Sequence, residues 1–202
     1  MAYQSPPLCA PAVLMLLLMG VISSYLPRVQ ARPQDFWRGP QAKTHMKRTI
    51  EELTVLTTQA ACVGSDMLPT PVQIPCVFVN TTEWENKTLQ QKCAEVVSTF
   101  QVFQHGVQGA KNGTTSKCQI SFLEQLEHRI LNYLAILNRL QIQTDTVTSS
   151  HPAVQSCSSQ THSVKGVLKQ FEKLLKGKLS RLTDDLKDNT KSERQGNQNQ
   201  GT

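Results

Sequence analysis

The sequence predicts an all-α protein: an up-up-down-down four-helix bundle with two long crossover loops and a small two-stranded β ribbon. Three observations lead to this fold class. Four segments carry apolar residues at helical spacing, a short connection joins the middle two, and long connections join the outer pairs. Each long connection also contains a strand-like stretch, and two such strands can pair into a ribbon against the bundle.

We expect the four helices at about residues 46–61, 88–105, 121–143 and 163–187. In each segment apolar residues recur every three or four positions, with Lys, Glu, Gln or Arg between them, as in a helix with one buried face. We interpret the following apolar positions as the core: Met46, Ile50, Leu53, Leu56 and Ala60 in the first segment; Leu89, Cys93, Val96, Val97, Phe100 and Phe103 in the second; Leu123, Leu126, Ile130, Tyr133, Leu134, Leu137 and Leu140 in the third; and Val164, Val167, Leu168, Phe171, Leu174, Leu175, Leu179, Leu182 and Leu186 in the fourth.

The connections distinguish this bundle from an up-and-down bundle, which needs only short loops. Residues 62–87 contain three prolines that prevent a helix, and their β-branched run at 72–79, interrupted by Pro75, predicts a strand. The connection between the third and fourth helices begins with a second strand-like stretch at 144–150, rich in Thr and Ser. The link at 106–117 is short and rich in Gly, Asn and Thr, which is typical of a turn.

The chain begins with the features of a signal peptide. Residues 11–24 are apolar and uncharged, and the run is too short to span a bilayer with flanks to spare. Val29-Gln30-Ala31 places small residues at the −3 and −1 positions, so we expect residues 1–31 to be removed and the protein to be secreted. Cleavage near Ser24 is one alternative. A signal anchor is another, because the first ten residues carry no Lys or Arg.

The remaining length suits a single domain. We expect a flexible N-terminal segment at 32–45, the four-helix domain at 46–187 and a disordered tail at 188–202. The tail has no apolar residue with which to form a core. No second apolar stretch approaches a membrane span, so we expect no membrane insertion. We also expect the protein to be a monomer.

The net charge favours acidic partners. Removal of residues 1–31 takes away one basic residue, Arg28, and no acidic one, so the formal charge falls from +6 to +5. A charge of this size favours acidic surfaces such as glycosaminoglycans or an acidic receptor face. The basic residues are spread along the chain without interleaved aromatic residues, so we do not expect nucleic-acid binding.

The cysteines predict disulfide bonds. After residue 31 the chain contains Cys62, Cys76, Cys93, Cys118 and Cys157, and none of them belongs to a C-x-x-C motif, so a zinc or thioredoxin-type site is not expected. In an oxidising compartment they should pair. Five choices of the unpaired cysteine, times three pairings of the other four, leave fifteen arrangements open.

Three N-x-T triplets agree with secretion, at Asn80, Asn86 and Asn112. Together they predict N-linked glycans, so each asparagine should face solvent.

Enzyme motifs are missing from the sequence: the histidines form no His-x-x-x-His or His-Glu-x-x-His pair, and there is no G-x-S-x-G or phosphate-binding glycine loop. We therefore expect no catalytic residues, no metal site and no cofactor.

Several short motifs resemble the interleukin-4/interleukin-13 family of short-chain four-helix cytokines, over residues 47–182. The similar stretches are Ile50-Glu51-Glu52-Leu53 with Leu56-Thr57 in the first helix; Asn80-Thr81-Thr82-Glu83 and Cys93-Ala94 at the second; Cys118, Phe122 and Ile136-Leu137-Asn138-Arg139-Leu140 in the third; and Val167-Leu168-Lys169 with Phe171-Glu172-Lys173-Leu174-Leu175 in the fourth. The resemblance implies the bridges Cys62–Cys118 and Cys93–Cys157, with Cys76 extra. The chain lacks the cysteines for the family's bridge between its two ends.

The same resemblance implies a function: dimerisation of type I cytokine receptors, an interleukin-4 receptor alpha-like chain plus a second chain, which triggers intracellular kinases in type 2 immune regulation. Glu51 and Glu52 on the first helix and Arg139 on the third match the family's first receptor contact. Lys176 and Leu179 on the fourth helix match its second contact. The position most typical of the basic side of the first contact is Ile142 here.

Two further functions remain open. A helical hormone of the erythropoietin and thrombopoietin kind shares the helix layout, a proline-rich first crossover and the run Leu175-Lys176-Gly177-Lys178-Leu179. It differs in its expected cysteine pairing, which ties the chain ends. A secreted carrier is the third possibility, and an apolar cavity inside the bundle would favour it.

Overall fold

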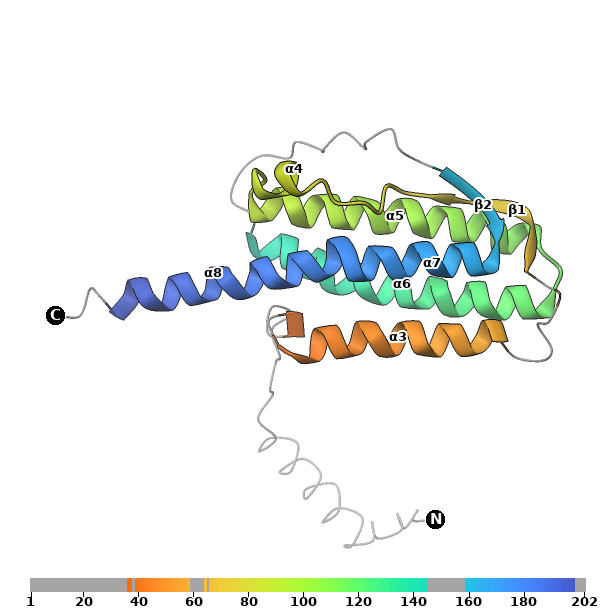
Figure 1. Ribbon diagram of the computed structural model, residues 1–202, viewed down its shortest axis with the longest axis horizontal. Coiled ribbons are helices and arrows are strands. Elements are labelled where there is room, and N and C mark those ends of the chain that lie inside the picture. Colours follow the sequence, from red (N-terminus) through yellow and green to blue (C-terminus); the bar gives the residue numbers. More distant parts are fainter. Residues whose placement is uncertain (1–35, 38, 59–63, 65, 145–158, 199–202) are drawn as a thin grey trace, which may run out of the picture. The chain divides into compact units, whose positions relative to one another are not determined.

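The computed structural model describes residues 36–37, 39–58, 64, 66–144 and 159–198, with side chains described up to residues 140 and 189 in the last two ranges. All described elements belong to one compact unit, residues 32–202. They follow in the order α3 (Gln41–Thr58), β1 (Met67–Ile74), α4 (Thr81–Glu85), α5 (Leu89–Gly113), α6 (Lys117–Thr144), β2 (Ser159–Ser163), α7 (Val164–Leu174), the π-helix η2 (Leu175–Leu179) and α8 (Ser180–Gln198) (Figure 1). The predicted mainly helical fold with a small antiparallel ribbon is confirmed.

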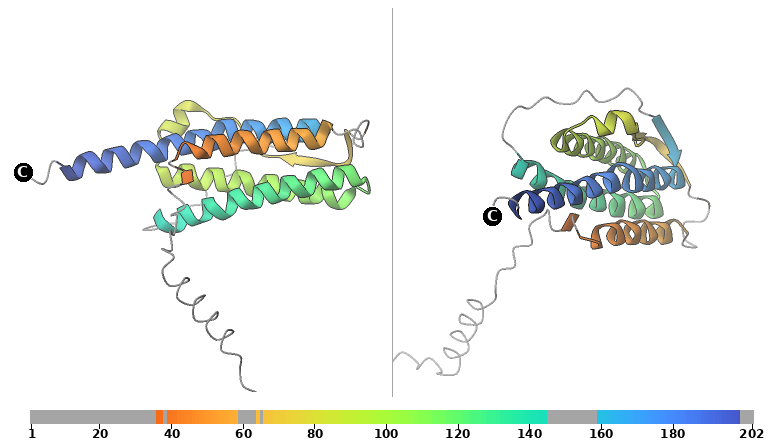
Figure 2. Two further views of the ribbon diagram at one scale, coloured as in Figure 1. Left: turned by 90° about the horizontal axis from the view of Figure 1, so that it is seen from below. Right: turned by 60° about the vertical axis from the view of Figure 1, so that its left-hand side comes forward.

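Long helices lie side by side in this unit. Figure 2 shows α3 beside α7, and α5 beside α6, and most of the residues that these helices bury are apolar. Aromatic side chains fill the centre: the ring centroids of Phe100 and Tyr133 are 5.6 Å apart, and those of Phe103 and Phe171 are 5.8 Å apart. All four are almost completely buried. The predicted apolar stripes therefore form one core, which the hydrophobic effect stabilises.

The β ribbon differs from the prediction in both strands. β1 begins at Met67 and ends at Ile74, whereas the strand was predicted at 72–79, so it also includes Pro69 and Pro71, which were expected only to prevent a helix. The pairing with β2 has an irregular register between Met67 and Val72, where prolines lacking an N–H can be accommodated. The partner strand is the polar segment Ser159–Ser163 rather than 144–150, of which residues 145–150 lie outside the described residues.

Helix α5 continues into the segment 106–117, where a turn was expected, and ends at Gly113. Gly106 is buried within it, and a Cβ there would lie 2.4 Å from the backbone O of Gln73. Glycine is therefore needed at this position because β1 crosses the helix closely. Only residues 114–116 separate α5 from α6.

The two ends of the domain are more ordered than predicted. Helix α3 begins at Gln41, and Trp37 is fully buried, with its ring centroid 6.0 Å from that of Tyr133. A flexible segment at 32–45 is therefore wrong for the described residues, because one tryptophan contributes enough apolar surface to anchor it. Helix α8 extends to Gln198, so the predicted disorder is wrong for 188–198, whereas 199–202 lie outside the described residues.

Of the helices in the described part of the chain, none is long and apolar enough to cross a membrane. The expected signal peptide at 1–31 lies outside the described residues.

Candidate functional site

The segment that follows β1 lies along the last helix and presents an exposed aromatic residue. Val77 is buried, whereas Phe78 is 71% exposed. The Phe78 ring lies under the ammonium of Lys173, 5.2 Å from the ring centroid, and the Arg181 guanidinium donates to the Thr81 hydroxyl at 3.2 Å. These contacts fix an aromatic side chain in solvent beside basic residues.

The segment packs against the π-helix η2. A Cβ on Gly177 would be in ordinary van der Waals contact with it, 3.6 Å from the Val77 carbonyl oxygen and 4.0 Å from a Val79 side-chain carbon. π-helical turns are rare and occur often at functional sites. We define the Phe78 surface as Phe78, Lys173, Lys176 and Arg181.

The two lysines of η2 have opposite environments. Lys176 is exposed and pairs with Glu172, whereas Lys178 is 2% exposed and its ammonium lies 2.8 Å from Glu95. The other Glu95 oxygen accepts from Lys87 at 2.7 Å. Burial alone would raise the pKa of Glu95, but the hydrogen bonds from Lys178 and Lys87 outweigh it and lower the pKa. This cluster joins α5 to η2.

Among the predicted receptor contacts on the fourth helix, Lys176 is accessible and Leu179 is not. Leu179 is 0% exposed and belongs to the hydrophobic core. Its proposed role in direct binding is therefore wrong, because a partner could reach its side chain only by opening the bundle. The apolar spacing of the fourth segment had correctly predicted Leu179 as a core residue.

A second group of predicted contacts lies on α3 and α6. Glu51 is exposed, but Glu52 accepts from Arg48 at 2.7 Å and from Arg129 at 2.6 Å, which connects α3 to α6. The hydrogen bond from Arg48 is the largest cause that lowers the pKa of Glu52, and the charge of Arg129 adds to it. Arg139 is exposed and, ten residues further along α6, lies about 15 Å from Arg129.

The structure thus brings Glu52 together with Arg129, which the sequence analysis missed, and not with Arg139. The spacing along α6 could have identified Arg129. It lies three residues after Leu126, directly before Ile130 and four residues before Tyr133, and these three are buried, so Arg129 borders the core stripe. We define the α3–α6 surface as Glu51, Glu52, Val55, Arg129 and Arg139. Val55 adds an exposed apolar side chain, 58% exposed.

The cysteines require one correction. Cys93 is a free, buried thiol whose sulfur lies 4.0 Å from the Leu137 carbonyl oxygen, and burial raises its pKa to about 12. The predicted bridge Cys93–Cys157 is therefore wrong. Cys76, expected to be extra, is disulfide-bonded, as is Cys118. Cys62 and Cys157 lie outside the described residues.

All three asparagines of the N-x-T triplets are exposed. Asn80 also begins α4, where its side-chain oxygen accepts from the backbone N–H of Glu83 at 3.4 Å. Asn86 ends the same short helix, and Asn112 lies at the end of α5. Glycosylation at these positions remains a prediction.

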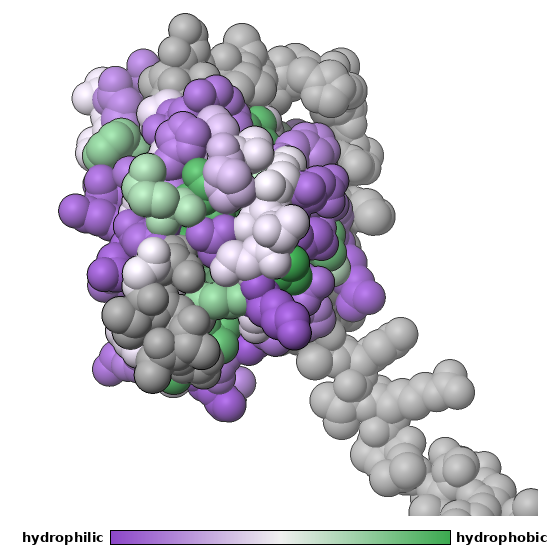
Figure 3. Space-filling model, turned by 90° about the vertical axis from the view of Figure 1, so that its right-hand side faces the viewer, coloured by the Kyte–Doolittle hydropathy of each residue, from purple (hydrophilic) through white to green (hydrophobic). Residues whose placement is uncertain are grey.

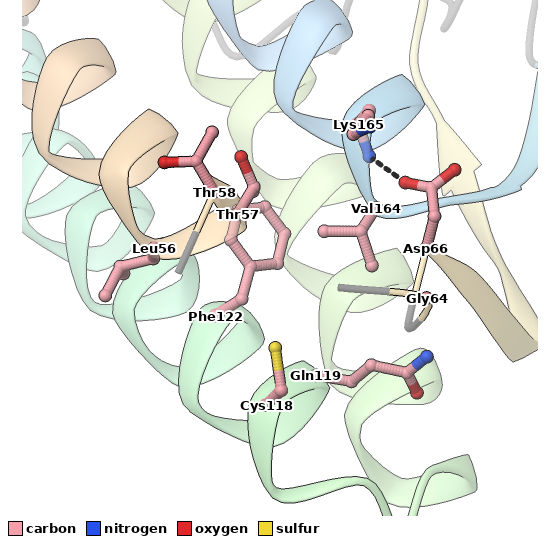
Figure 4. A pocket seen from close by; sticks show the side chains of 10 residues that line it. All are labelled: Leu56, Thr57, Thr58, Gly64, Asp66, Cys118, Gln119, Phe122, Val164 and Lys165. Carbon is pink, nitrogen blue, oxygen red and sulfur yellow. Dashed lines mark hydrogen bonds between the residues drawn. The ribbon is translucent and has the colours of Figure 1, made fainter. Parts of the chain in front are cut away.

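One pocket of about 270 Å³ lies where the end of α3 meets the beginnings of α6 and α7 (Figure 4). Leu56, Phe122 and Val164 line it with apolar groups. Asp66 borders it but is already used, since it accepts from the Lys165 backbone N–H at 3.0 Å and from the Ser163 hydroxyl at 2.8 Å. The pocket lies at the end of the bundle rather than inside it, which does not favour a carrier.

Figure 3 shows the surface at this end. Where described residues are visible, hydrophobic side chains lie in separate spots among hydrophilic and intermediate ones. Met67, which begins β1, is an isolated exposed apolar residue, 68% exposed. Among the described residues, no group of three His, Cys, Asp or Glu side chains could hold a metal ion.

A family model described as erythropoietin/thrombopoietin matches residues 42–188, from the second residue of α3 into α8. No individual curated protein is similar enough to count as a match.

Proposed function

The chain belongs to the erythropoietin/thrombopoietin family, and we propose from this that it is a secreted helical cytokine that brings two type I receptor chains together. Members of the family are signalling hormones and not enzymes. Juxtaposition of the receptors would activate the kinases bound to their cytoplasmic parts. The chemistry required of the cytokine is therefore recognition only.

We also propose the up-up-down-down arrangement for the bundle. The course of the chain in Figure 1 supports it: α3 and α5 run in one direction across the picture, and α6 and α7 run back. Consecutive helices that run in the same direction need a long connection. Residues 59–80 connect α3 to the helices that follow β1, and residues 145–163 connect α6 to α7.

The observation that carries the proposal is the Phe78 surface. A single large aromatic side chain that is 71% exposed, contacted by a cation and next to the buried Val77, has the character of a binding hot spot. Lys173 over the ring and Arg181, hydrogen-bonded to Thr81 three residues further along, have no carboxylate partner among the described residues, and their positive charge suits an acidic receptor face and speeds association.

The α3–α6 surface is the proposed site for the second receptor chain. Figures 1 and 2 show α3 and the segment after β1 on opposite sides of the bundle, so two receptor chains could bind without overlapping. Glu51, Val55 and Arg139 are its accessible side chains. Glu52 is engaged with Arg48 and Arg129, and its role would be to hold the two helices in position.

We favour receptors of the kind used by this family's hormones over an interleukin-4 receptor alpha-like chain. The interleukin-4-like role in type 2 immunity depended partly on a cysteine pattern that included a Cys93 bridge. Because Cys93 is free and the family model covers most of the domain, a role as a hormone of the erythropoietin and thrombopoietin kind has the stronger support.

The test is binding to candidate type I receptor ectodomains, measured by surface plasmon resonance. Phe78→Ala should weaken binding at least tenfold, equivalent to about 1.4 kcal/mol. Met67→Ala is the matched control, because it removes an equally exposed apolar side chain elsewhere, and it should change affinity less than twofold. Equal affinities for wild type, Phe78→Ala and Met67→Ala would exclude the Phe78 surface from the site.

A further inference from the structure

Most basic side chains in the described part of the chain are neutralised by a carboxylate within 4.0 Å, as the pairs Lys43–Asp184, Lys92–Asp185 and Lys111–Glu127 illustrate. The basic side chains without such a partner in the described ranges are Lys117, Arg139, Lys165, Lys169, Lys173 and Arg181. The net positive charge of the domain is thus concentrated at a few positions.

Three of these positions form a line. Lys165, Lys169 and Lys173 follow one another at intervals of four residues on α7, so they lie on the same face and span about 12 Å. Lys165 and Lys169 are exposed, and Lys173 lies over Phe78. We call these three residues the lysine stripe.

The acidic groups nearby do not neutralise the stripe. Asp66 accepts from the backbone N–H of Lys165 and from Ser163 at the start of α7, and Glu172 pairs with Lys176. The stripe therefore keeps three ammonium groups free for an external anion.

The rest of this helix face is polar. Every apolar side chain of α7 is turned into the bundle, including Val164, Val167, Leu168 and Phe171. A protein interface of ordinary size has an apolar centre, and a membrane-surface helix inserts apolar side chains, so the first half of α7 suits neither. Phe171, the aromatic residue of α7, is buried in the core, so this face also lacks the row of exposed stacking groups that single-stranded nucleic acids use.

We propose that the lysine stripe binds a linear sulfated polysaccharide of the glycosaminoglycan class. A row of compact ammonium charges on a convex helix matches an extended chain of sulfate and carboxylate groups, and lysine is suited to point-charge contacts with such anions. Because Lys173 belongs to both the stripe and the Phe78 surface, the polysaccharide would hold the cytokine beside its receptor-binding surface.

Elution of the secreted full-length protein from immobilised heparin tests this. Lys165→Gln/Lys169→Gln removes two charges from the stripe, and Lys47→Gln/Lys117→Gln removes two from other helices, so both variants have the same net charge. The stripe variant should elute at lower salt than the control, and its slope of log affinity against log salt should fall by roughly 1 to 2. Circular dichroism should show equal helicity for all three proteins.

Coincident elution of the two variants would overturn the proposal. An equal loss of binding to immobilised polyglutamate, or to phosphatidylserine vesicles, would also overturn it, since the stripe would then bind any polyanion. Receptor affinity separates this inference from the proposed function. The stripe variant should keep receptor affinity within twofold, whereas a loss there with heparin binding intact would remove the polysaccharide site and leave the receptor proposal standing.

Discussion

Two residues show how the same side chain can support two incompatible predictions from sequence. Cys93 lies in the apolar stripe of its helix and also completes a plausible pair of disulfides, and Leu179 is both a stripe position and a match to a receptor contact. In both cases the buried position prevails. Periodicity reports the burial of many residues at once, whereas each alternative depended on one local similarity.

The cysteines provide a direct chemical prediction. With Cys93 free and both Cys76 and Cys118 bonded, two bridges can form after residue 31 among Cys62, Cys76, Cys118 and Cys157. We predict the bridges Cys62–Cys118 and Cys76–Cys157, identified by mass spectrometry of unreduced peptides. Iodoacetamide should modify only Cys93, and only after unfolding. A peptide that joins Cys93 to another cysteine would contradict this assignment.

The cluster around Lys178 predicts a large effect from a small change. Glu95→Gln leaves the ammonium of Lys178 buried without its carboxylate, which should lower the free energy of unfolding at pH 7 by about 3 kcal/mol. The control Glu51→Gln removes an exposed partner of Lys47 and should cost less than about 0.5 kcal/mol. Urea unfolding followed by circular dichroism measures both.

The pH dependence of that difference follows from the lowered pKa of Glu95. A carboxyl group whose pKa is lower in the folded state stabilises the fold above its unfolded value, here 4.5, and this stabilisation is lost as the pH falls through the folded value. The difference between wild type and Glu95→Gln should therefore shrink below about pH 4. A difference that stayed constant at low pH would mean that Glu95 acts through packing alone.

At the scale of elements, the positions of the four long helices agree with the prediction, but several of their ends differ by several residues. Gly106 illustrates the reason: glycine normally marks a helix end, but here it permits contact between α5 and β1. Pro69 and Pro71 prevent a helix, as predicted, but they lie inside a strand that was expected to begin only at Val72, because the pairing with β2 is irregular there. In each case a neighbour distant in sequence determines the outcome.

Two of the glycines of α5 predict opposite effects of the same substitution. Gly106→Ala places a methyl group 2.4 Å from the Gln73 backbone and should lower the free energy of unfolding by about 1 to 3 kcal/mol. Gly109→Ala is exposed, meets nothing within 4 Å and should raise it by about 0.5 to 1 kcal/mol through helix propensity. Thermal unfolding followed at 222 nm compares them. Equal shifts would show that β1 does not restrict Gly106.

At the scale of the molecule, a bridging cytokine needs two independent surfaces. Glu51→Lys/Arg139→Glu changes only the α3–α6 surface, so it should retain binding of the receptor chain at the Phe78 surface within twofold. It should nevertheless lose signalling, because the second chain would not be recruited. In a cell assay it should then compete with the wild-type protein and act as an antagonist. Full signalling by this variant would remove the α3–α6 surface from the second site.

The sequence by itself determined the helical class, the two long connections and most of the core, although not Trp37, Trp84 or Phe122. These features depend on the spacing of apolar residues within a segment, and they need no knowledge of distant neighbours. It also identified Lys176 as an accessible basic residue and the three exposed asparagines. The resemblance to a cytokine family reached the correct broad class but a different family within it from the one the chain belongs to.

Only the tertiary structure decided the rest. It buried Lys178 and exposed Phe78, paired Glu52 with Arg129, anchored Trp37 in the core and left the lysines of α7 without carboxylates. Each of these outcomes depends on which segments meet across the bundle. Burial and charge pairing are properties of neighbours in space, and a one-dimensional pattern specifies a residue's face on its own helix but not the side chain it meets there.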